Sequence, residues 1–189
     1  MVILSKTQRG HYMKTIETER LTLRSLQLDD ALVIEKLAGD YNVAKTTLSI
    51  PHPYPKGSAK DFITYMLQAE TDKKVVIFSI IDKNNNELLG VMNLNLDHIH
   101  KRGELAYWIG RPYWGNGFST EAAKALLHYG FNELHLNKIF AAAFTNNPGS
   151  WRIMEKIGMK HEGTFKQHVV KSGEPMDLTY YGILLDEYK

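Results

Sequence analysis

The order in which strand-like and helix-like segments follow one another constrains the fold of this chain more than any other feature. Three runs with strand patterns, Val75–Ile81, Leu88–Leu96 and Glu104–Gly110, are separated only by short polar turns. The third run leads through a glycine-rich turn into a helical pattern over Ser119–Leu134 and then into another strand-like run, Lys138–Phe144. Hairpins make neighbouring strands antiparallel, whereas a strand–helix–strand crossover makes them parallel. A chain with this order must therefore build a mixed sheet.

Further segments complete the pattern on both sides of this central part. The predicted elements are a strand within Thr18–Leu26, helices over about 29–38, 58–72 and 150–157, and two closing strands over 165–170 and 178–185. The predicted fold class is α+β (mixed α/β), with a central, mostly antiparallel sheet of six or seven strands and helices on both faces.

The length and composition indicate one folded domain. The chain has 189 residues, of which 43% are hydrophobic and 23% are charged, so it can bury a sizeable core without metal or disulfide support. Residues 1–12 show neither a helical nor a strand period. We interpret residues 1–12 as an N-terminal extension, disordered or vector-derived, and residues 13–189 as a single domain.

Charge and residue usage exclude several classes of function. Lys and Arg total 23 against 21 for Asp and Glu, and a net charge of +2 gives no electrostatic footprint for nucleic acid. Cysteine is absent, which removes thiol nucleophiles, thiolate metal sites and disulfides and favours a cytoplasmic location. No run is long enough to span a membrane. His98 and His100 have no third ligand in register, so we expect no metal.

The turn Gly115–Asn116–Gly117 is the most informative short segment. Two glycines allow backbone N–H groups to approach a ligand closely, and the helix start that follows adds unpaired donors and a partial positive charge. The residues for a Walker loop or a dinucleotide fingerprint are missing. The turn is therefore either a phosphate site of another type or simply a tight turn.

Two blocks of residues around this turn resemble the GNAT superfamily of N-acetyltransferases. The first block runs from Gly103 to Ile109, continues with Trp114–Gly117 and ends at Glu121–Ala122; the second contains Asn147, Ser150, Glu155–Met159, Glu162–Gly163, Gly173 and Asp177. The resemblance covers about Ile16 to Leu185. Within the superfamily, the sequence is similar to the ribosomal-protein-alanine N-acetyltransferase branch (RimJ/RimL type). It implies a GNAT domain, acetyl-CoA as co-substrate, and a splayed parallel strand pair at the acetyl-CoA site.

The resemblance also implies which residues hold acetyl-CoA. Backbone donors near Trp108 and Ile109 would hold the pantetheine arm, and Asn147 would hydrogen-bond it. The amides of Gly115, Asn116, Gly117, Phe118, Ser119 and Thr120 would cradle the pyrophosphate. Ser119 and Thr120 could instead cap the helix, and Asn147 could belong to a plain turn. Pro112 departs from the family pattern, which has Gln or Arg at that place.

Two residues are the candidates for catalysis. Glu104 lies on the strand where the acetyl group should sit, and we expect it to act as general base through water. Ser150 occupies the position of a family hydroxyl and is expected to hydrogen-bond the departing sulfur, with a helix cap as the alternative role. Met154 stands where many relatives have a tyrosine acid. Glu162 is a second candidate for the base, and more readily explained as a structural residue.

The sequence does not decide which amine accepts the acetyl group. The leading hypothesis is an enzyme that acetylates a protein N-terminal α-amine in a ternary complex, as a monomer or homodimer. The alternatives are a small-molecule amine, such as a polyamine, aminoglycoside or amino acid analogue, and a non-catalytic acyl-CoA-binding sensor. The sequence has no acidic run of the kind that would favour a polycation.

Overall fold

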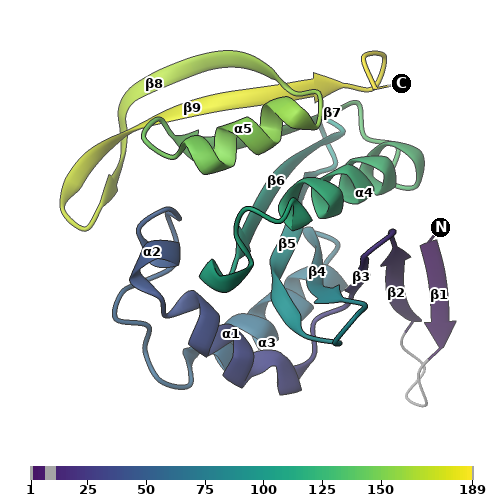
Figure 1. Ribbon diagram of the computed structural model, residues 1–189. Helices are drawn as coiled ribbons and strands as arrows, with labels where there is room; N and C mark the ends of the chain where they lie inside the picture. The colour runs from purple at the N-terminus through teal and green to yellow at the C-terminus, as the bar shows by residue number, and fades with distance from the viewer. Residues whose placement is uncertain (1, 7–11, 189) are drawn as a thin grey trace.

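The computed structural model describes residues 2–6 and 12–188. Nine strands form one sheet in the order β1-β2-β3-β4-β5-β6-β7-β9-β8 (Figure 1). The strands are β1 (Val2–Lys6), β2 (Tyr12–Glu17), β3 (Leu21–Arg24), β4 (Val75–Asp82), β5 (Leu88–Asp97), β6 (Arg102–Ile109), β7 (Lys138–Phe144), β8 (Lys160–Lys171) and β9 (Glu174–Leu184). The helices are α1 (Ala31–Ala38), α2 (Tyr41–Ala44), α3 (Ser58–Thr71), α4 (Phe118–Asn132) and α5 (Pro148–Lys156).

The predicted mixed sheet with one parallel strand pair is confirmed. The pair is β6 and β7, and every other neighbouring pair in the sheet is antiparallel. Parallel pairing covers only Arg102↔Lys138, Gly103↔Ile139 and Glu104↔Phe140, although β6 stays paired with β5 as far as Ile109. The two strands therefore separate beyond Glu104 and leave one edge of β6 without a strand partner.

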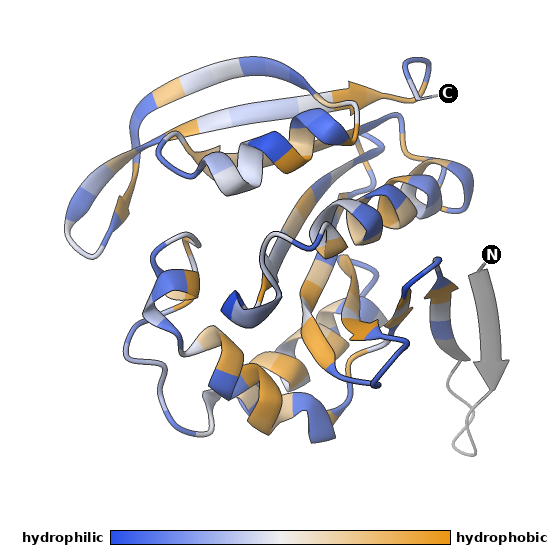
Figure 2. Ribbon diagram, in the orientation of Figure 1, coloured by the Kyte–Doolittle hydropathy of each residue, from blue (hydrophilic) through white to orange (hydrophobic). Residues whose placement is uncertain are grey.

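Helices cover both faces of the sheet, as predicted. Helices α4 and α5 pack on one face, where Leu105 of β6 and Ile139 of β7 join the larger apolar core. Helices α1 and α3 pack on the other face, against Val91 of β5 and Ile77 of β4. The central strands β4 and β5 are apolar along most of their length, whereas β8 is largely polar (Figure 2). The hairpin of β8 and β9 thus extends beyond the helical layers.

The structure differs from the sequence prediction mainly at the chain ends. The sheet has nine strands instead of six or seven because β2 and β1 extend it beyond β3. Strand β1 lies within the segment 1–12, where the sequence pattern predicts no element, and pairs antiparallel with β2. An edge strand is stabilised by backbone pairing with its neighbour and needs no amphipathic pattern of its own. Residues 1 and 7–11 of this segment lie outside the described residues.

A buried ion pair fastens the start of α1 to the sheet. The Asp30 carboxylate, 6% exposed, accepts hydrogen bonds from both terminal nitrogens of Arg24 at 2.8 and 2.6 Å and from the Ser79 hydroxyl at 2.8 Å. The backbone N–H of Gln27 also donates to Asp30, at 3.0 Å. Burial alone would raise the pKa of Asp30, but these hydrogen bonds outweigh it and hold the pKa below its usual value.

Replacing Asp30 with asparagine should lower the free energy of unfolding by about 3 kcal/mol at neutral pH, because Arg24 then loses a buried counter-charge. Since the pKa of Asp30 is lowered in the folded state, this stabilisation is complete above the unfolded pKa of about 3.9 and disappears as the pH falls through the folded value. Urea unfolding from pH 7 down to acid measures both effects. Asp72→Asn, in an exposed pair with Lys74, is the matched control and should change stability by about 0.5 kcal/mol or less. Equal losses in the two variants would contradict this account.

Candidate active site

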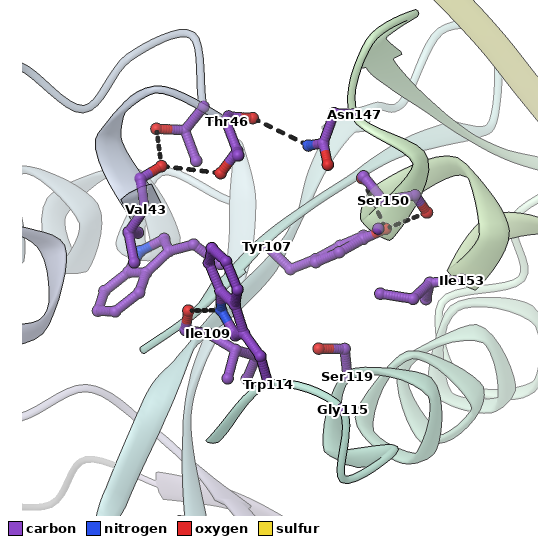
Figure 3. A pocket seen from close by; sticks show the side chains of 13 residues that line it. Val43, Thr46, Tyr107, Ile109, Trp114, Gly115, Ser119, Asn147, Ser150 and Ile153 are labelled. Carbon is purple, nitrogen blue, oxygen red and sulfur yellow. Dashed lines mark hydrogen bonds between the residues drawn. The ribbon is translucent and has the colours of Figure 1, made fainter. Parts of the chain in front are cut away.

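A cavity of about 240 Å³ lies where β6 and β7 separate (Figure 3). Its walls come from the end of β6, the glycine turn with the start of α4, the first turns of α5, and the segment around α2. None of the described residues that line it carries a charge. They are Val43, Thr46, Thr47, Tyr107, Trp108, Ile109, Trp114, Gly115, Ser119, Asn147, Gly149, Ser150 and Ile153.

The glycine turn at one end of the cavity has backbone conformations that glycine adopts more readily than other residues. Gly115 and Gly117 have φ values of 79° and 80°, a region that favours glycine. Gly117 is the N-cap of α4 and provides no side chain for capping, so N–H groups of the first helical turn lack intrahelical partners. The helix begins at Phe118, which makes Ser119 and Thr120 helical residues; the alternative that they cap the helix is wrong. Ser119 lines the cavity.

Arg20 supports this turn from outside the cavity, and the sequence analysis missed it. Its guanidinium donates to the Asn116 carbonyl at 3.0 Å and lies 4.7 Å from the centre of the Phe118 ring. Glu121 fixes Arg20 in turn, since its carboxylate accepts from the Arg20 Nε at 2.7 Å and from the Thr18 hydroxyl at 2.7 Å. The Phe118 ring therefore packs against Arg20, and we expect Phe118 to contact a ligand through its backbone.

Gly117→Val should weaken acetyl-CoA binding at least tenfold, because a β-branched side chain both strains the backbone at this φ and blocks the approach of a phosphate. Isothermal calorimetry of the folded variant measures the loss. Gly57→Val is the matched control, since Gly57 is the left-handed N-cap of α3 and carries the same backbone strain at a different helix. Wild-type affinity in Gly117→Val, or an equal loss in Gly57→Val, would contradict the assignment of this turn.

Tyr107 and Ser150 both line the cavity, and the hydroxyl end of Tyr107 meets Ser150 there (Figure 3). The Tyr107 hydroxyl is 3.0 Å from the Ser150 Oγ and donates to the Ser150 backbone carbonyl at 3.0 Å. Burial raises the pKa of Tyr107 to about 12, so this hydroxyl stays protonated at neutral pH and acts as a hydrogen-bond donor. The sequence analysis did not identify Tyr107, because its partner lies 43 residues further along the chain.

Ser150 is not a helix cap. Helix α5 begins at Pro148 instead of Ser150, and its N-cap is Asn147, which makes no side-chain capping bond. The Ser150 hydroxyl instead lies against Tyr107 in the cavity. Met154, one helical turn further, is 1% exposed and packs in the core beneath α5. The position that holds a tyrosine in many relatives is therefore buried in this chain.

Asn147 connects α5 to the segment after α2. Its side-chain amide donates to the Thr46 carbonyl at 3.2 Å, and both residues line the cavity (Figure 3). Thr46 in turn donates from its hydroxyl to the Val43 carbonyl at 2.8 Å. Asn147 thus holds a wall of the cavity in place. Neither of the two roles expected for Asn147, as a ligand of the pantetheine arm or as part of a turn, includes this contact.

The end of β6 provides the wall between the glycine turn and Tyr107. The indole N–H of Trp114 donates to the Ile109 carbonyl at 2.7 Å and fixes the entry to the glycine turn (Figure 3). Trp108 packs partly against the core of α1 and α3, on the face opposite Tyr107. Because β7 has separated at this point, the backbone edge of β6 is open to an extended ligand such as a pantetheine arm.

Glu104 lies at the last paired position before the two strands separate. It is opposite Asn95 of β5 and Phe140 of β7, and its side chain is half-buried. Side chains alternate along a strand, so Glu104 and Tyr107 project from opposite faces of β6. Glu104 does not line the cavity but stands at the point where β6 and β7 begin to separate. Glu162 is exposed and forms an ion pair with Lys138 at 2.6 Å.

Residues 2–6 and 12–188 contain neither a candidate metal site nor a candidate membrane-spanning helix. No group of three histidine, aspartate or glutamate side chains there is placed to hold a metal ion. No helix in this part of the chain is both long and apolar enough to cross a membrane.

Comparisons with known proteins agree with this geometry. The family model described as an acetyltransferase (GNAT) domain matches residues 20–160. "Uncharacterized N-acetyltransferase p20" of Bacillus licheniformis is 33% identical over 177 residues, which span 93% of this chain and 99% of that protein. "Putative ribosomal N-acetyltransferase YdaF" of Bacillus subtilis is 34% identical over 56% of this chain and 58% of its own length. "Spermidine N(1)-acetyltransferase" of Escherichia coli is 25% identical over 80% of this chain and 79% of its own length. This chain belongs to the GNAT family and is an acetyl-CoA-dependent N-acetyltransferase.

Proposed function

We propose that this enzyme acetylates the α-amine at the N-terminus of a protein or peptide. The observation that carries the proposal is that no charged residue among those described lines the cavity, which is where the acceptor amine has to meet the acetyl group, since a polyamine would be expected to meet carboxylates that pair with its positive charges. The partial similarity to YdaF and the resemblance to the ribosomal-protein-alanine branch favour the same acceptor. The similarity to the spermidine enzyme favours a polyamine and is the reason that both acceptors must be tested.

The chemistry of the amine also favours an α-amine. An α-amine has a pKa near 8 and is partly neutral at pH 7, whereas a lysine-type amine with a pKa near 10.4 is almost entirely protonated. Only the neutral amine has the lone pair that attacks a carbonyl carbon. A single carboxylate acting through water is therefore a sufficient base for an α-amine, and the position of Glu104 where β6 and β7 separate supports giving it this part.

Residues of this chain have separate parts in the proposed reaction. Acetyl-CoA supplies the acetyl group as a thioester. The amides of Gly115 to Thr120 would hold its pyrophosphate, and the open edge of β6 would align its pantetheine arm. Glu104 accepts, through water, the proton that the amine loses as its nitrogen bonds to the carbonyl carbon. Ser150, held by Tyr107, donates a hydrogen bond to the sulfur as the carbon–sulfur bond breaks.

Thiol release from acetyl-CoA in the presence of a panel of amines tests this proposal. The panel contains peptides with a free α-amine, the same peptides with that amine blocked, spermidine, and an aminoglycoside. We expect release with the free peptides and little with their blocked forms. Release with spermidine alone would support the small-molecule alternative. A protein that binds acetyl-CoA but releases no thiol with any amine would support the sensor alternative.

A further inference from the structure

A second hollow, of about 410 Å³, lies on the face of the sheet opposite α4 and α5. We call it the aromatic groove. It is separate from the cavity already described and shares none of its lining residues. Its walls come from the starts of β6 and β7 and from the β8–β9 hairpin: Arg102, Lys138, Phe140, Glu162, Gly163, Phe165, His168 and Tyr180.

Aromatic side chains form one wall of the groove and are open to solvent. Phe165 is 53% exposed, and its ring lies 5.0 Å from the His168 ring and 5.2 Å from the Tyr180 ring, measured between centroids. Phe140 forms part of the floor, with the Arg102 guanidinium 5.7 Å from the centre of its ring. A large phenylalanine that is half exposed beside two other rings offers a surface onto which a further ring can stack.

The charged groups of the groove are already paired with each other or with neighbours. Lys138 binds both oxygens of Glu162, at 2.6 and 2.7 Å, and Arg102 donates to Asp97 at 3.1 Å. The charge of the Glu162 carboxylate is therefore already balanced by Lys138. A ligand of this groove gains its binding energy from apolar and aromatic contact.

The groove adjoins the strand position of Glu104. Phe140 is paired with Glu104 in the parallel register, at the point where β6 and β7 separate. Tyr180 of β9 is the register partner of Ala142, two positions beyond Phe140 on β7, so this groove tyrosine lies near the strand position of the expected base. An acceptor that lies in the groove can direct its amine to Glu104 on this face. Acetyl-CoA would approach the separating strands from the cavity already described.

We propose that the aromatic groove is the acceptor site of this enzyme, and that it selects peptides with an aromatic side chain close to the reacting α-amine. This inference rests on the proposed function and adds the substrate class. Phe165, His168 and Tyr180 contact the aromatic side chain, and Glu104 receives the proton of the amine.

The test compares steady-state kinetics of two peptides that are identical except for phenylalanine or alanine near the N-terminus. Wild type should have a lower KM for the phenylalanine peptide, and Phe165→Ala should raise that KM about tenfold, since an aromatic contact surface is lost. Phe165→Tyr should restore most of the preference. The KM for acetyl-CoA should be the same in all forms. Tyr65→Ala, which removes an exposed tyrosine from α3, is the control and should behave as wild type.

Three results would overturn the inference, and they are distinguishable. If Phe165→Ala leaves both peptide KM values unchanged while wild type acetylates both peptides, the groove is not the acceptor site although the proposed function holds. If Phe165→Ala changes only the oligomeric state measured by light scattering, the groove is an interface between copies of the chain. If wild type acetylates spermidine and neither peptide, the proposed function fails together with the inference.

Discussion

Replacing Glu104 with glutamine is expected to lower turnover about 100-fold or more, with acetyl-CoA affinity nearly unchanged. Glutamine has the same shape as glutamate but cannot accept the proton that the attacking amine must lose, and general bases contribute roughly 10²–10⁴-fold to rates. Glu104 does not line the cavity, so the substitution should not disturb the acetyl-CoA site. Turnover measured from about pH 6 to 9, together with calorimetry of acetyl-CoA, separates the two quantities.

Glu133→Gln is the matched control for Glu104→Gln, and Glu162 is the other candidate for the general base. Glu133→Gln removes an exposed carboxylate at the end of α4 and should leave turnover at the wild-type level. If Glu104→Gln keeps full turnover over the whole pH range, Glu104 is not the base. If Glu162→Gln causes the loss instead, the base is the residue that the structure shows paired with Lys138.

Ser150→Ala is expected to lower turnover about 100-fold while the dissociation constant for acetyl-CoA stays within a few-fold. A serine hydroxyl does not ionise at neutral pH, so its contribution is a hydrogen bond to the developing thiolate. Loss of one such donor in a dry site typically costs about 2.7–4 kcal/mol, and solvent access reduces this cost. Stopped-flow measurement of thiol release gives the rate directly.

Tyr107→Phe is the partner variant for Ser150→Ala. It retains the Ser150 hydroxyl but removes the phenol that lies 3.0 Å from it, so we expect a smaller loss of about five- to tenfold, the value of one neutral hydrogen bond. The double variant should be no slower than Ser150→Ala alone, because Tyr107 acts through Ser150. If Ser150→Ala loses thermal stability but keeps full turnover, the hydroxyl is structural and thiolate departure depends on water or backbone amides.

The parts of the site that lie within one strand or one turn could be predicted from the sequence. The parallel pair followed from the strand–helix–strand order, and the glycine turn from two glycines before a helix, because both depend on local backbone rules. That the pair is splayed was expected only from the resemblance to the GNAT superfamily. Contacts between distant segments carry no such signal. Arg20 reaches the glycine turn across 96 residues, and Asn147 reaches Thr46 across 101. Arg20 and the contact between Asn147 and Thr46 were missed because only the folded chain brings these residues together.

Helix starts were predicted to within two residues, and the error has a physical cause. The sequence offers serine as a cap at Ser119 and Ser150, whereas the structure uses Gly117 and Asn147. A serine is the usual cap because its hydroxyl satisfies an N–H of the first turn. A helix start that leaves those N–H groups without a side-chain partner is suited to bind an anion. Capping preferences alone cannot predict a helix start of this kind.

The most direct test of the proposed acceptor is the position of the acetyl group on a peptide that offers two amines. The peptide carries a free N-terminal α-amine, a phenylalanine close to it and one internal lysine, and it competes with an equal concentration of spermidine. After incubation with the enzyme and acetyl-CoA, fragmentation mass spectrometry locates the acetyl group. The account predicts acetylation of the α-amine and little product from the lysine or spermidine. Acetyl-spermidine as the main product, or an acetyl group on the lysine alone, would contradict it.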